Sequence, residues 1–569
     1  MTLNLDLIKA KYPFLRIPAR QHNSKEIVFT LDLGALSLPP ERRIETAELM
    51  LTRGFPEKGK ARIRLSKEAI LALPHVEENG WVCLNGDPGP GYGWPPEDRI
   101  METLYRFQEF IWEWGQGQLD FDFYDEPLNY WYIWVKQAVY RDIPIRKVWI
   151  ADNRPSESCV KEGRLLLPGR IVLTGDDQMV QRLAQSRRKA IQQEVSVRIA
   201  DIPIDVPLVP STWPKSDSEL ERLLFSRLNH EDRHRFLLPE GERRKGRGRY
   251  RVVLLRHLEH GYAYLLPGGP YISIGSGNPR HTYRPPPSLI PLVVERLDPS
   301  WTVGRDQYPE VNRRQKERVL IIGLGALGSP VADHLAKAGV GELTLVDDDT
   351  LEPANLGRHL LGANALEQPK VEGMSNHLSR TYPAVRVKPI KQNIEDWLID
   401  NRLDHYDLVL DLTGMEEVRR LLDRHRRRHP CPLLIAWMEP FVVAAHACLL
   451  PKDVPWIHNG KDHLEFLQAV TWPDEVVQQE PGCSTRFQSY TAVSAAYAVA
   501  LVAEKALDAL DKGINQQKVY SWTRSQTYLD KAWNHLELRE WAQRDDRGNG
   551  LPVDGTLIER SFPPEMIDP

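Results

Sequence analysis

The stretch RVLIIGLGALGSP, residues 318–330, joins an aliphatic run to three glycines, Gly323, Gly325 and Gly328. The aliphatic run predicts a buried strand. The GxGxxG spacing predicts a tight turn into a helix whose N-terminal amide groups face a phosphate. The next aliphatic run, ELTLV, leads into Asp347, whose carboxylate could bind a ribose hydroxyl. Dinucleotide and ATP sites both use this pattern, so an NAD-dependent oxidoreductase remains one alternative.

The chain around this stretch alternates between strands and a helix. We predict strands at residues 318–323, 342–348, 385–390 and 407–414, and a helix at residues 329–339. Such alternation is typical of a parallel α/β sheet. Two strongly apolar segments, residues 431–450 and 492–507, are interrupted by charged residues or proline. We therefore expect a buried strand pair and a core helix there, and no membrane span.

A short polar span after the second strand favours a triphosphate over a dinucleotide. It contains Asn355, Arg358 and Lys370. An enzyme that transfers a phosphoryl or adenylyl group must neutralise the charge that develops on the phosphate. A dehydrogenase has no general need for such a cationic cluster at this place. We therefore expect ATP as the ligand.

The motifs GLGALGS, AGVGELTLVDDDTLEPANLGRH and QPK closely resemble the adenylation domain of ubiquitin-activating (E1) enzymes and their ThiF/MoeB-type relatives. The resemblance covers roughly residues 310–510. It implies a Rossmann-like fold, a homodimer, ATP and Mg²⁺ as cofactors, and adenylation of a protein's C-terminal carboxylate.

The same resemblance implies roles for individual residues. Asp347 would hold the ribose, and Asn355, Arg358 and Lys370 would contact the phosphates. Asp349 is a further candidate near the same site. Many members of the family also supply an arginine from before the glycine loop, and the choice stays open among Arg305, Arg313 and Arg314.

One position departs from the family's pattern. The family ends its fourth strand with Asp-x-Thr-Asp, whose second aspartate serves Mg²⁺. This chain has Asp411, Leu412, Thr413 and Gly414 in that place. Asp411 or Asp349 could hold the metal instead, or metal binding could be weakened. A non-catalytic scaffold is the corresponding alternative function.

Cys483 lies on a Gly-Cys-Ser-Thr loop ahead of the predicted core helix. A thiol close to a helix N-terminus is favoured as the thiolate, which is the nucleophilic form. The loop resembles the catalytic cysteine loop of ubiquitin-activating enzymes, which implies capture of an acyl-adenylate as a thioester. Cys431 and Cys448 lie in apolar patterns, where we expect core packing. Cys159 lies in a polar stretch, where we expect a loop without a catalytic role.

Cys83 stands in LPHVEENGWVCLNGD, residues 73–87. This segment resembles the ubiquitin-conjugating (E2) fold, whose pattern is His-Pro-Asn, an aliphatic residue, a glycine three positions before the cysteine, and a following leucine. Here Pro74, His75, Gly80 and Cys83 stand at that spacing. His75 replaces the family's asparagine, and it could stabilise the oxyanion or accept the amine's proton. The resemblance implies that Cys83 receives the acyl group by transthiolation.

Composition agrees with a multidomain α/β and α+β protein. The 569 residues include 41% apolar and 27% charged residues, and the net charge of -4 gives no general attraction to nucleic acid or membranes. Only five cysteines occur, without a CxxC pair, which is typical of a reducing cytoplasm and argues against a cysteine-based zinc site.

We predict an E2-like domain at residues 1–155, a linker or docking region at 156–305, and a ThiF/E1-like domain at 306–569. In the first, we expect strands within residues 26–33 and 44–55 and a helix at 95–115.

Together these resemblances suggest a bacterial E2–E1 fusion of the Cap2 type found in CBASS antiphage systems. The expected cargo is the C-terminus of a cGAS-like nucleotidyltransferase, and the expected acceptor is an amine of a target protein. A free-standing ubiquitin-like modifier could replace that cargo with the same chemistry.

Overall fold

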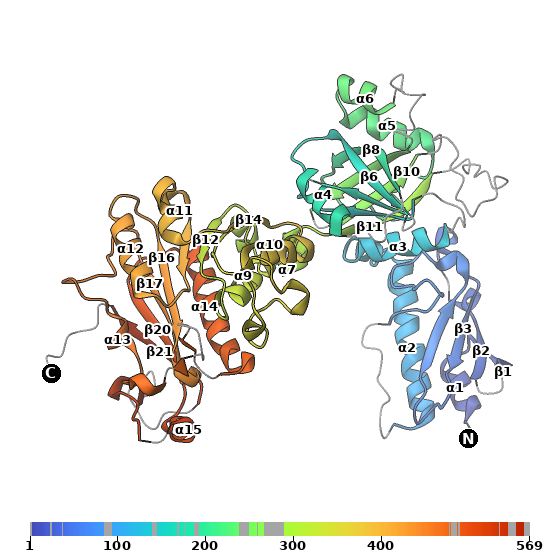
Figure 1. Cartoon of the computed structure of the whole chain (residues 1–569). Helices are drawn as coiled ribbons and strands as arrows, with labels where there is room; N and C mark the ends of the chain where they lie inside the picture. Colours follow the sequence, from blue (N-terminus) through green and yellow to red (C-terminus); the bar gives the residue numbers. More distant parts are fainter. Residues whose placement is uncertain are drawn as a thin grey trace. The chain divides into compact units, whose positions relative to one another are not determined.

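The computed structural model describes most of the chain. The described residues are 3–22, 26–36, 38–84, 94–138, 145–167, 170–175, 177–186, 193–237, 250–258, 260–266, 289–476, 478–479, 486–487, 490–533, 535–543 and 554–562. They form two compact units (Figure 1). The first comprises Met1–Thr174 and Ala190–Glu295, and the second comprises Gly175–Lys189 and Arg296–Pro569.

The first unit begins with a four-stranded antiparallel meander. Its strands run in the order β1 (Leu15–His22), β2 (Glu26–Asp32), β3 (Thr46–Leu51) and β4 (Ala61–Leu65), with helix α1 (Leu5–Lys11) before them. Helix α2 (Pro96–Gly115) buries one face against this core, including Ile100, Leu104, Phe107, Ile111 and Trp114. The predicted helix and the predicted strands of this region are thereby confirmed.

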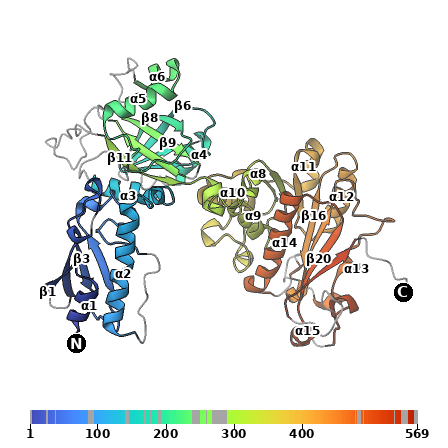
Figure 2. The same cartoon turned by 180° about the vertical axis from the view of Figure 1, so that it is seen from behind.

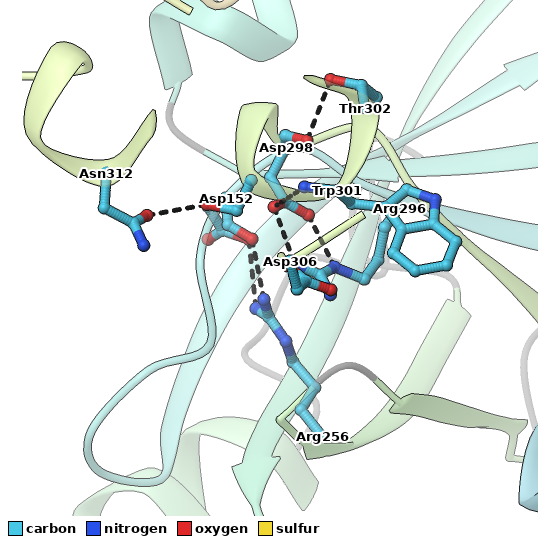
Figure 3. Close-up of polar contacts among 9 residues, drawn as sticks. Asp152, Arg256, Arg296, Asp298, Trp301, Thr302, Asp306 and Asn312 are labelled. Atoms are coloured by element: carbon cyan, nitrogen blue, oxygen red, sulfur yellow. Dashed lines mark hydrogen bonds and ion pairs between the residues drawn. The ribbon is translucent and has the colours of Figure 1, made fainter. Parts of the chain in front are cut away.

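The rest of the first unit is a closed seven-stranded barrel. Its strands are β5 (Lys147–Ile150), β6 (Cys159–Leu167), β7 (Ile171–Thr174), β8 (Gln193–Pro203), β9 (Tyr250–His257), β10 (His260–Leu265) and β11 (Ile290–Arg296). They close in the order β10-β11-β5-β7-β6-β8-β9. Cys159 begins β6, so our expectation that it lies in a loop is wrong. Inside the barrel wall, the fully buried Asp201 pairs with Lys161 and Arg256, and Arg256 also contacts Asp152 (Figure 3).

Three helices accompany the barrel. They are α3 (Pro127–Gln137), α5 (Asp217–Arg227) and α6 (His230–Leu237). The indole Nε1 of Trp131 on α3 donates to the carbonyl of Leu292 on β11 at 2.9 Å. Trp131 is fully buried in the apolar cluster of the barrel, whereas Ile133 of the same helix lies in the core of the meander, so α3 joins the two parts into one unit.

The second unit is built on an eight-stranded sheet. The strand order is β14 (Arg386–Ile390), β13 (Glu342–Val346), β12 (Arg318–Ile322), β15 (Leu408–Asp411), β16 (Leu433–Met438), β17 (Ala444–Leu450), β20 (Lys518–Thr523) and β21 (Thr556–Ser561). The first five strands pair in parallel, and the last three continue the sheet in antiparallel pairs. The predicted parallel α/β core and buried strand pair are confirmed.

Helices cover both faces of this sheet (Figure 2). One face packs against α9 (Gly328–Lys337), α10 (Lys370–Thr381) and α14 (Ala492–Lys512). The other packs against α11 (Ile394–Asp400) and α12 (Glu416–Arg426). Shorter helices of this unit are α7 (Pro299–Gly304), α8 (Glu310–Arg314), α13 (Leu464–Leu467) and α15 (Gln526–Ala532). Among the described residues, no helix is both long enough and apolar enough to cross a membrane.

Helix α4 (Asp177–Ser186) lies between β7 and β8 in the sequence but belongs to the second unit. It packs against α10, and the Arg182 Nε donates to the carbonyl of Pro383 at 2.7 Å. The chain therefore passes between the two units three times.

Candidate functional site

The glycine loop connects β12 to α9 at the carboxyl edge of the parallel strands. Gly323 has φ +86°, a conformation that favours glycine. A Cβ on Gly328 would lie 1.9 Å from the carbonyl oxygen of Gly323, so a side chain is excluded there. A Cβ on Gly325 would meet no atom within 4 Å. Two glycines thus shape the turn, and the third leaves open space over which a phosphate could approach.

Asp347 follows β13 and ties that strand's end to the glycine loop. Its Oδ2 accepts a hydrogen bond from the Leu324 amide at 2.6 Å, and its Oδ1 accepts one from the Asp349 amide at 2.9 Å. Burial raises the pKa of the Asp347 carboxyl, although these two amides and the Lys370 charge oppose the rise. Each carboxylate oxygen keeps acceptor capacity for a ribose hydroxyl.

Lys370 and Asp349 are brought together by a short bridge between their segments. The Lys370 Nζ lies 2.6 Å from the Asp349 Oδ2, and the Lys370 amide donates to the Asp349 carbonyl at 3.0 Å. Lys370 is 7% exposed although it carries a charge. A buried cation at the start of α10 is well placed to bind an anion, because it has little hydration to lose.

Asn355 and Arg358 lie on the segment between β13 and α10. The Asn355 Oδ1 accepts from the Glu352 amide at 3.0 Å, which leaves the side-chain NH₂ group to donate elsewhere. The Arg358 guanidinium lies over the Tyr490 ring at 5.2 Å. A neighbouring group therefore contacts each of the two side chains: the Glu352 amide contacts Asn355, and the Tyr490 ring contacts Arg358.

His359 was missed by sequence reasoning. It is 8% exposed, and its Nδ1 accepts from the Leu361 amide at 3.0 Å. Burial, reinforced by the Lys370 charge, lowers the pKa of His359 to about 4, against the opposing effect of the Leu324 backbone. No motif marks this residue, because a single histidine after an arginine has no periodic or spacing signal.

Asp411 ends β15 with its carboxylate almost fully buried. Its Oδ1 accepts from the Thr413 hydroxyl at 2.7 Å and the Thr413 amide at 3.1 Å. Burial raises the pKa of Asp411, and the Thr413 hydrogen bonds oppose the rise. The next turn places Gly414 at φ +70°, a conformation that favours glycine.

The three candidate arginines have different environments. Arg314 is bound to Asp511 through its Nε at 2.8 Å and to the Ala338 carbonyl, which gives it a structural role. Arg313 is half exposed and lies 3.9 Å from Asp511. Arg305 lies over the Trp301 ring at 4.8 Å.

The ring of Trp301 also contacts Arg296, at 5.6 Å. Arg296 is held by Asp298 and Asp306 through paired hydrogen bonds of 2.6 to 2.9 Å (Figure 3). Arg305 therefore contacts the same Trp301 ring as Arg296, the arginine that the two aspartates bind. Arg305 remains a candidate together with Arg313.

The Cys83 region of the first unit forms a tight hairpin-like turn. Val76 and Val82 are bridged antiparallel, and the Cys83 amide donates to the His75 carbonyl at 2.7 Å. Gly80 has φ +81°, and a Cβ there would lie 2.4 Å from the Leu65 carbonyl oxygen. The turn leaves Cys83 exposed to solvent and fixes His75 beside it in the backbone.

The remaining cysteines that the structure describes differ in burial. Cys431 and Cys448 are fully buried, which confirms their predicted core packing. Burial raises the pKa of Cys431 to about 11 and raises that of Cys448 as well, so neither favours the thiolate. Cys483 lies outside the described residues. The helix that follows it, α14, begins after Thr491, whose hydroxyl accepts from the Ser494 amide.

Comparison with known proteins assigns the second unit. Residues 303–540 match the family model described as the ThiF family. The chain contains a ThiF domain. The ATP-dependent ubiquitin transferase-like protein Cap2 of Pseudomonas aeruginosa is 24% identical over 491 residues, which cover 84% of this chain and 87% of that protein.

The ThiF domain also has shorter relatives. The molybdopterin-synthase adenylyltransferase of Haemophilus influenzae is 38% identical over 118 residues, 21% of this chain and 49% of that protein. The crystal structure of Escherichia coli MccB with ATP aligns at 19% identity over 37% of this chain and 61% of that chain, with a TM-score of 0.28. The sequence matches show that the second unit is similar to the ThiF family and, over a shorter stretch, to an adenylyltransferase.

Proposed function

We propose that the ThiF domain adenylates the C-terminal carboxylate of a partner protein. A carboxylate oxygen of the partner attacks the α-phosphorus of ATP, and pyrophosphate leaves. The observation that carries this proposal is the buried Lys370, paired with Asp349 at 2.6 Å, at the same strand edge as the glycine loop and Asp347. Lys370 and Arg358 would neutralise charge on the phosphates, and Asp347 would hold the ribose.

Two groups of oxygens fit the Mg²⁺ that such chemistry uses. Carboxylate oxygens of Asp347, Asp348 and Asp349 lie within 4.8 Å of one another. The Asp411 Oδ2 is buried and has no hydrogen-bond partner among the residues that the structure describes. Hard oxygen ligands are those that Mg²⁺ prefers, and the ion would add positive charge at the phosphates.

We further propose that the acyl group moves to cysteine. The Cys483 thiolate attacks the acyl-adenylate, forms a thioester and releases AMP. The Cys83 thiolate then exchanges with that thioester, and an amine of a target protein displaces Cys83 to form an amide. Exposure of Cys83, its hydrogen bond to His75, and a Cap2 relative that aligns over most of the chain support this order.

The cargo that we propose is the C-terminus of a cGAS-like nucleotidyltransferase. A free-standing ubiquitin-like modifier would use the same residues. Pairing of two ThiF domains into a homodimer belongs to the same proposal.

Mixing the full chain with Mg·ATP and each candidate cargo tests the relay on a non-reducing gel. We expect a thiol-sensitive adduct and, with a target protein present, a thiol-resistant conjugate. Cys483→Ala should abolish both species while pyrophosphate exchange continues. Cys83→Ala should keep the adduct on Cys483 and abolish the conjugate.

Cys159→Ala is the matched control, because Cys159 is the other partly exposed thiol that the structure describes. It should change neither species. A conjugate that persists in Cys83→Ala contradicts the relay, and absence of pyrophosphate exchange with every cargo contradicts adenylation.

A further inference from the structure

Asp122 lies 39 residues after Cys83 in the sequence, yet it contacts the histidine of the Cys83 turn. Its Oδ2 is 2.9 Å from the His75 Nε2. Both side chains are partly buried, at 28% and 26% exposure. The pair therefore has restricted access to water, which strengthens a charged hydrogen bond relative to a fully exposed one.

The His75 residue is held in place from three further sides. Its amide donates to the Tyr130 hydroxyl at 3.0 Å, and Tyr130 is itself buried on α3. Its ring packs edge-on against Phe110 of α2, with centroids 6.4 Å apart. Its carbonyl accepts from the Cys83 amide. Its backbone has φ +58°, a left-handed conformation that costs free energy for a residue with a side chain.

The hydrogen bond to Asp122 decides which imidazole nitrogen carries the proton. An ionised carboxylate can only accept, so a neutral His75 must place its hydrogen on Nε2. Its lone pair then lies on Nδ1. A carboxylate that fixes a histidine tautomer in this way keeps the other nitrogen available as a base.

We propose that Asp122 is a positioning residue for the last step at Cys83, so that His75 accepts the proton of the attacking amine. This inference rests on the proposed function of Cys83 as an acyl carrier. The amine nitrogen forms a bond to the thioester carbonyl carbon, and the carbon–sulfur bond breaks. Cys83 leaves as the thiolate, and the amine's proton passes to His75 Nδ1 and then to solvent.

The neighbouring acidic side chains have other environments. Asp120 is bound to Arg42 at 2.5 Å, and Asp125 is exposed. Asp125 therefore offers a matched control within the same turn, because, within the described part of the chain, its carboxylate makes no hydrogen bond to His75.

The test uses the full chain with Cys159→Ser and Cys483→Ser, so that Cys83 is the exposed thiol available for loading. The probe is a fluorescent glycine-ended peptide supplied as its 2-mercaptoethanesulfonate thioester, which loads Cys83 directly by exchange. Loading is measured by intact mass, and release to Nα-acetyl-lysine amide is measured as the rate of amide formation.

We expect Asp122→Asn and Asp122→Ala to load normally but to form the amide at least ~10-fold more slowly, which is part of the ~10²–10⁴-fold that general acid–base catalysis typically contributes. Asp122→Glu should recover part of the rate, because it restores a carboxylate. Asp125→Asn should match the unsubstituted rate. In a His75→Ala background, Asp122→Ala should add less than about twofold, because residues that act as a unit are not additive.

Equal amide rates for Asp122→Asn and the unsubstituted chain would overturn the inference while leaving the carrier role of Cys83 intact. Full additivity with His75→Ala would overturn it as well, since a purely structural role predicts independent effects. If loaded Cys83 forms no amide in the unsubstituted chain, the last step of the proposed function fails and the inference fails with it.

Discussion

Buried ionisable residues beside the glycine loop have altered pKa values. His359 and Asp411 are both nearly inaccessible to water, and burial disfavours the charged form of each. The pKa of the histidine is therefore lowered and that of the aspartate is raised. Free energy of unfolding must depend on pH through both groups.

His359 provides the sharper prediction. Its folded pKa of about 4 lies below the ordinary value of 6.5, so the unfolded chain binds the proton more readily between these values. The stabilisation is complete above pH 6.5 and is lost as the pH falls through this window. At pH 5 we expect a loss of about 2 kcal/mol relative to pH 7.5.

The measurement is urea unfolding of the second unit at pH 7.5 and pH 5. His359→Asn keeps an acceptor for the Leu361 amide but does not titrate, so it should show about 2 kcal/mol less dependence on pH. His334→Asn, at an exposed histidine of α9, should behave like the unsubstituted chain. Equal pH dependence in His359→Asn would contradict the burial argument.

Two residues that matter at this scale could not be predicted from sequence. Asp122 contacts His75 only because the 3₁₀ helix Asp120–Tyr124 folds back after the long helix α2. The environment of His359 depends on the glycine-loop residue Leu324 and on Lys370 of α10, which reach it only through the tertiary fold. By contrast, the proximity of Asp347, Asp349 and Lys370 was predictable, because they belong to one motif of fixed spacing.

At the scale of elements, two glycines of the glycine loop meet different physical requirements. Gly328 is needed for the close approach of α9 to the end of β12. Gly325 faces open space. The same substitution at the two positions should therefore have different consequences.

Gly328→Ala should lower both stability and ATP binding, because its Cβ would overlap the Gly323 carbonyl oxygen at 1.9 Å. Gly325→Ala should leave the melting temperature within about 1 °C but weaken ATP binding roughly 10-fold, since the methyl group would occupy space needed by a phosphate. Thermal melts with and without Mg·ATP distinguish these effects. Unchanged ATP binding in Gly325→Ala would show that the phosphates approach elsewhere.

Helices and strands were predicted correctly where the local sequence pattern was enough to define them. The parallel strands of the second unit are continuous aliphatic runs, and α2 has a regular apolar face. The barrel was not predicted, because it mixes parallel and antiparallel pairs between strands far apart in sequence. Nothing in residues 156–305 signals that such strands close into a ring.

At the scale of the whole molecule, α4 lies within the barrel region of the sequence but packs beside the proposed nucleotide site. It leaves the barrel sequence and packs on α10, the helix that begins with Lys370. Met179 and Val180 of α4 are buried. Support for a proposed phosphate ligand therefore comes from a segment more than a hundred residues before the ThiF match.

Met179→Ala should destabilise the second unit by about 2 kcal/mol or more, as expected for truncation of a buried methionine. Hydrogen exchange in α10 should become faster, and the KM for ATP should rise a fewfold. The control is Gln178→Ala, at an exposed position of the same helix, which should have little effect. Unchanged exchange in α10 would mean that α4 does not support it.

The chain passes between the two units three times, and this limits how its segments can be exchanged with those of a relative. An exchange of everything after residue 295 for the same region of a relative would import a new α10 but retain the old α4. The surfaces of these two helices would then have to match by chance. We therefore expect α4 and α10 to be inherited together, and functional chimeras to require two coordinated crossovers rather than a single junction.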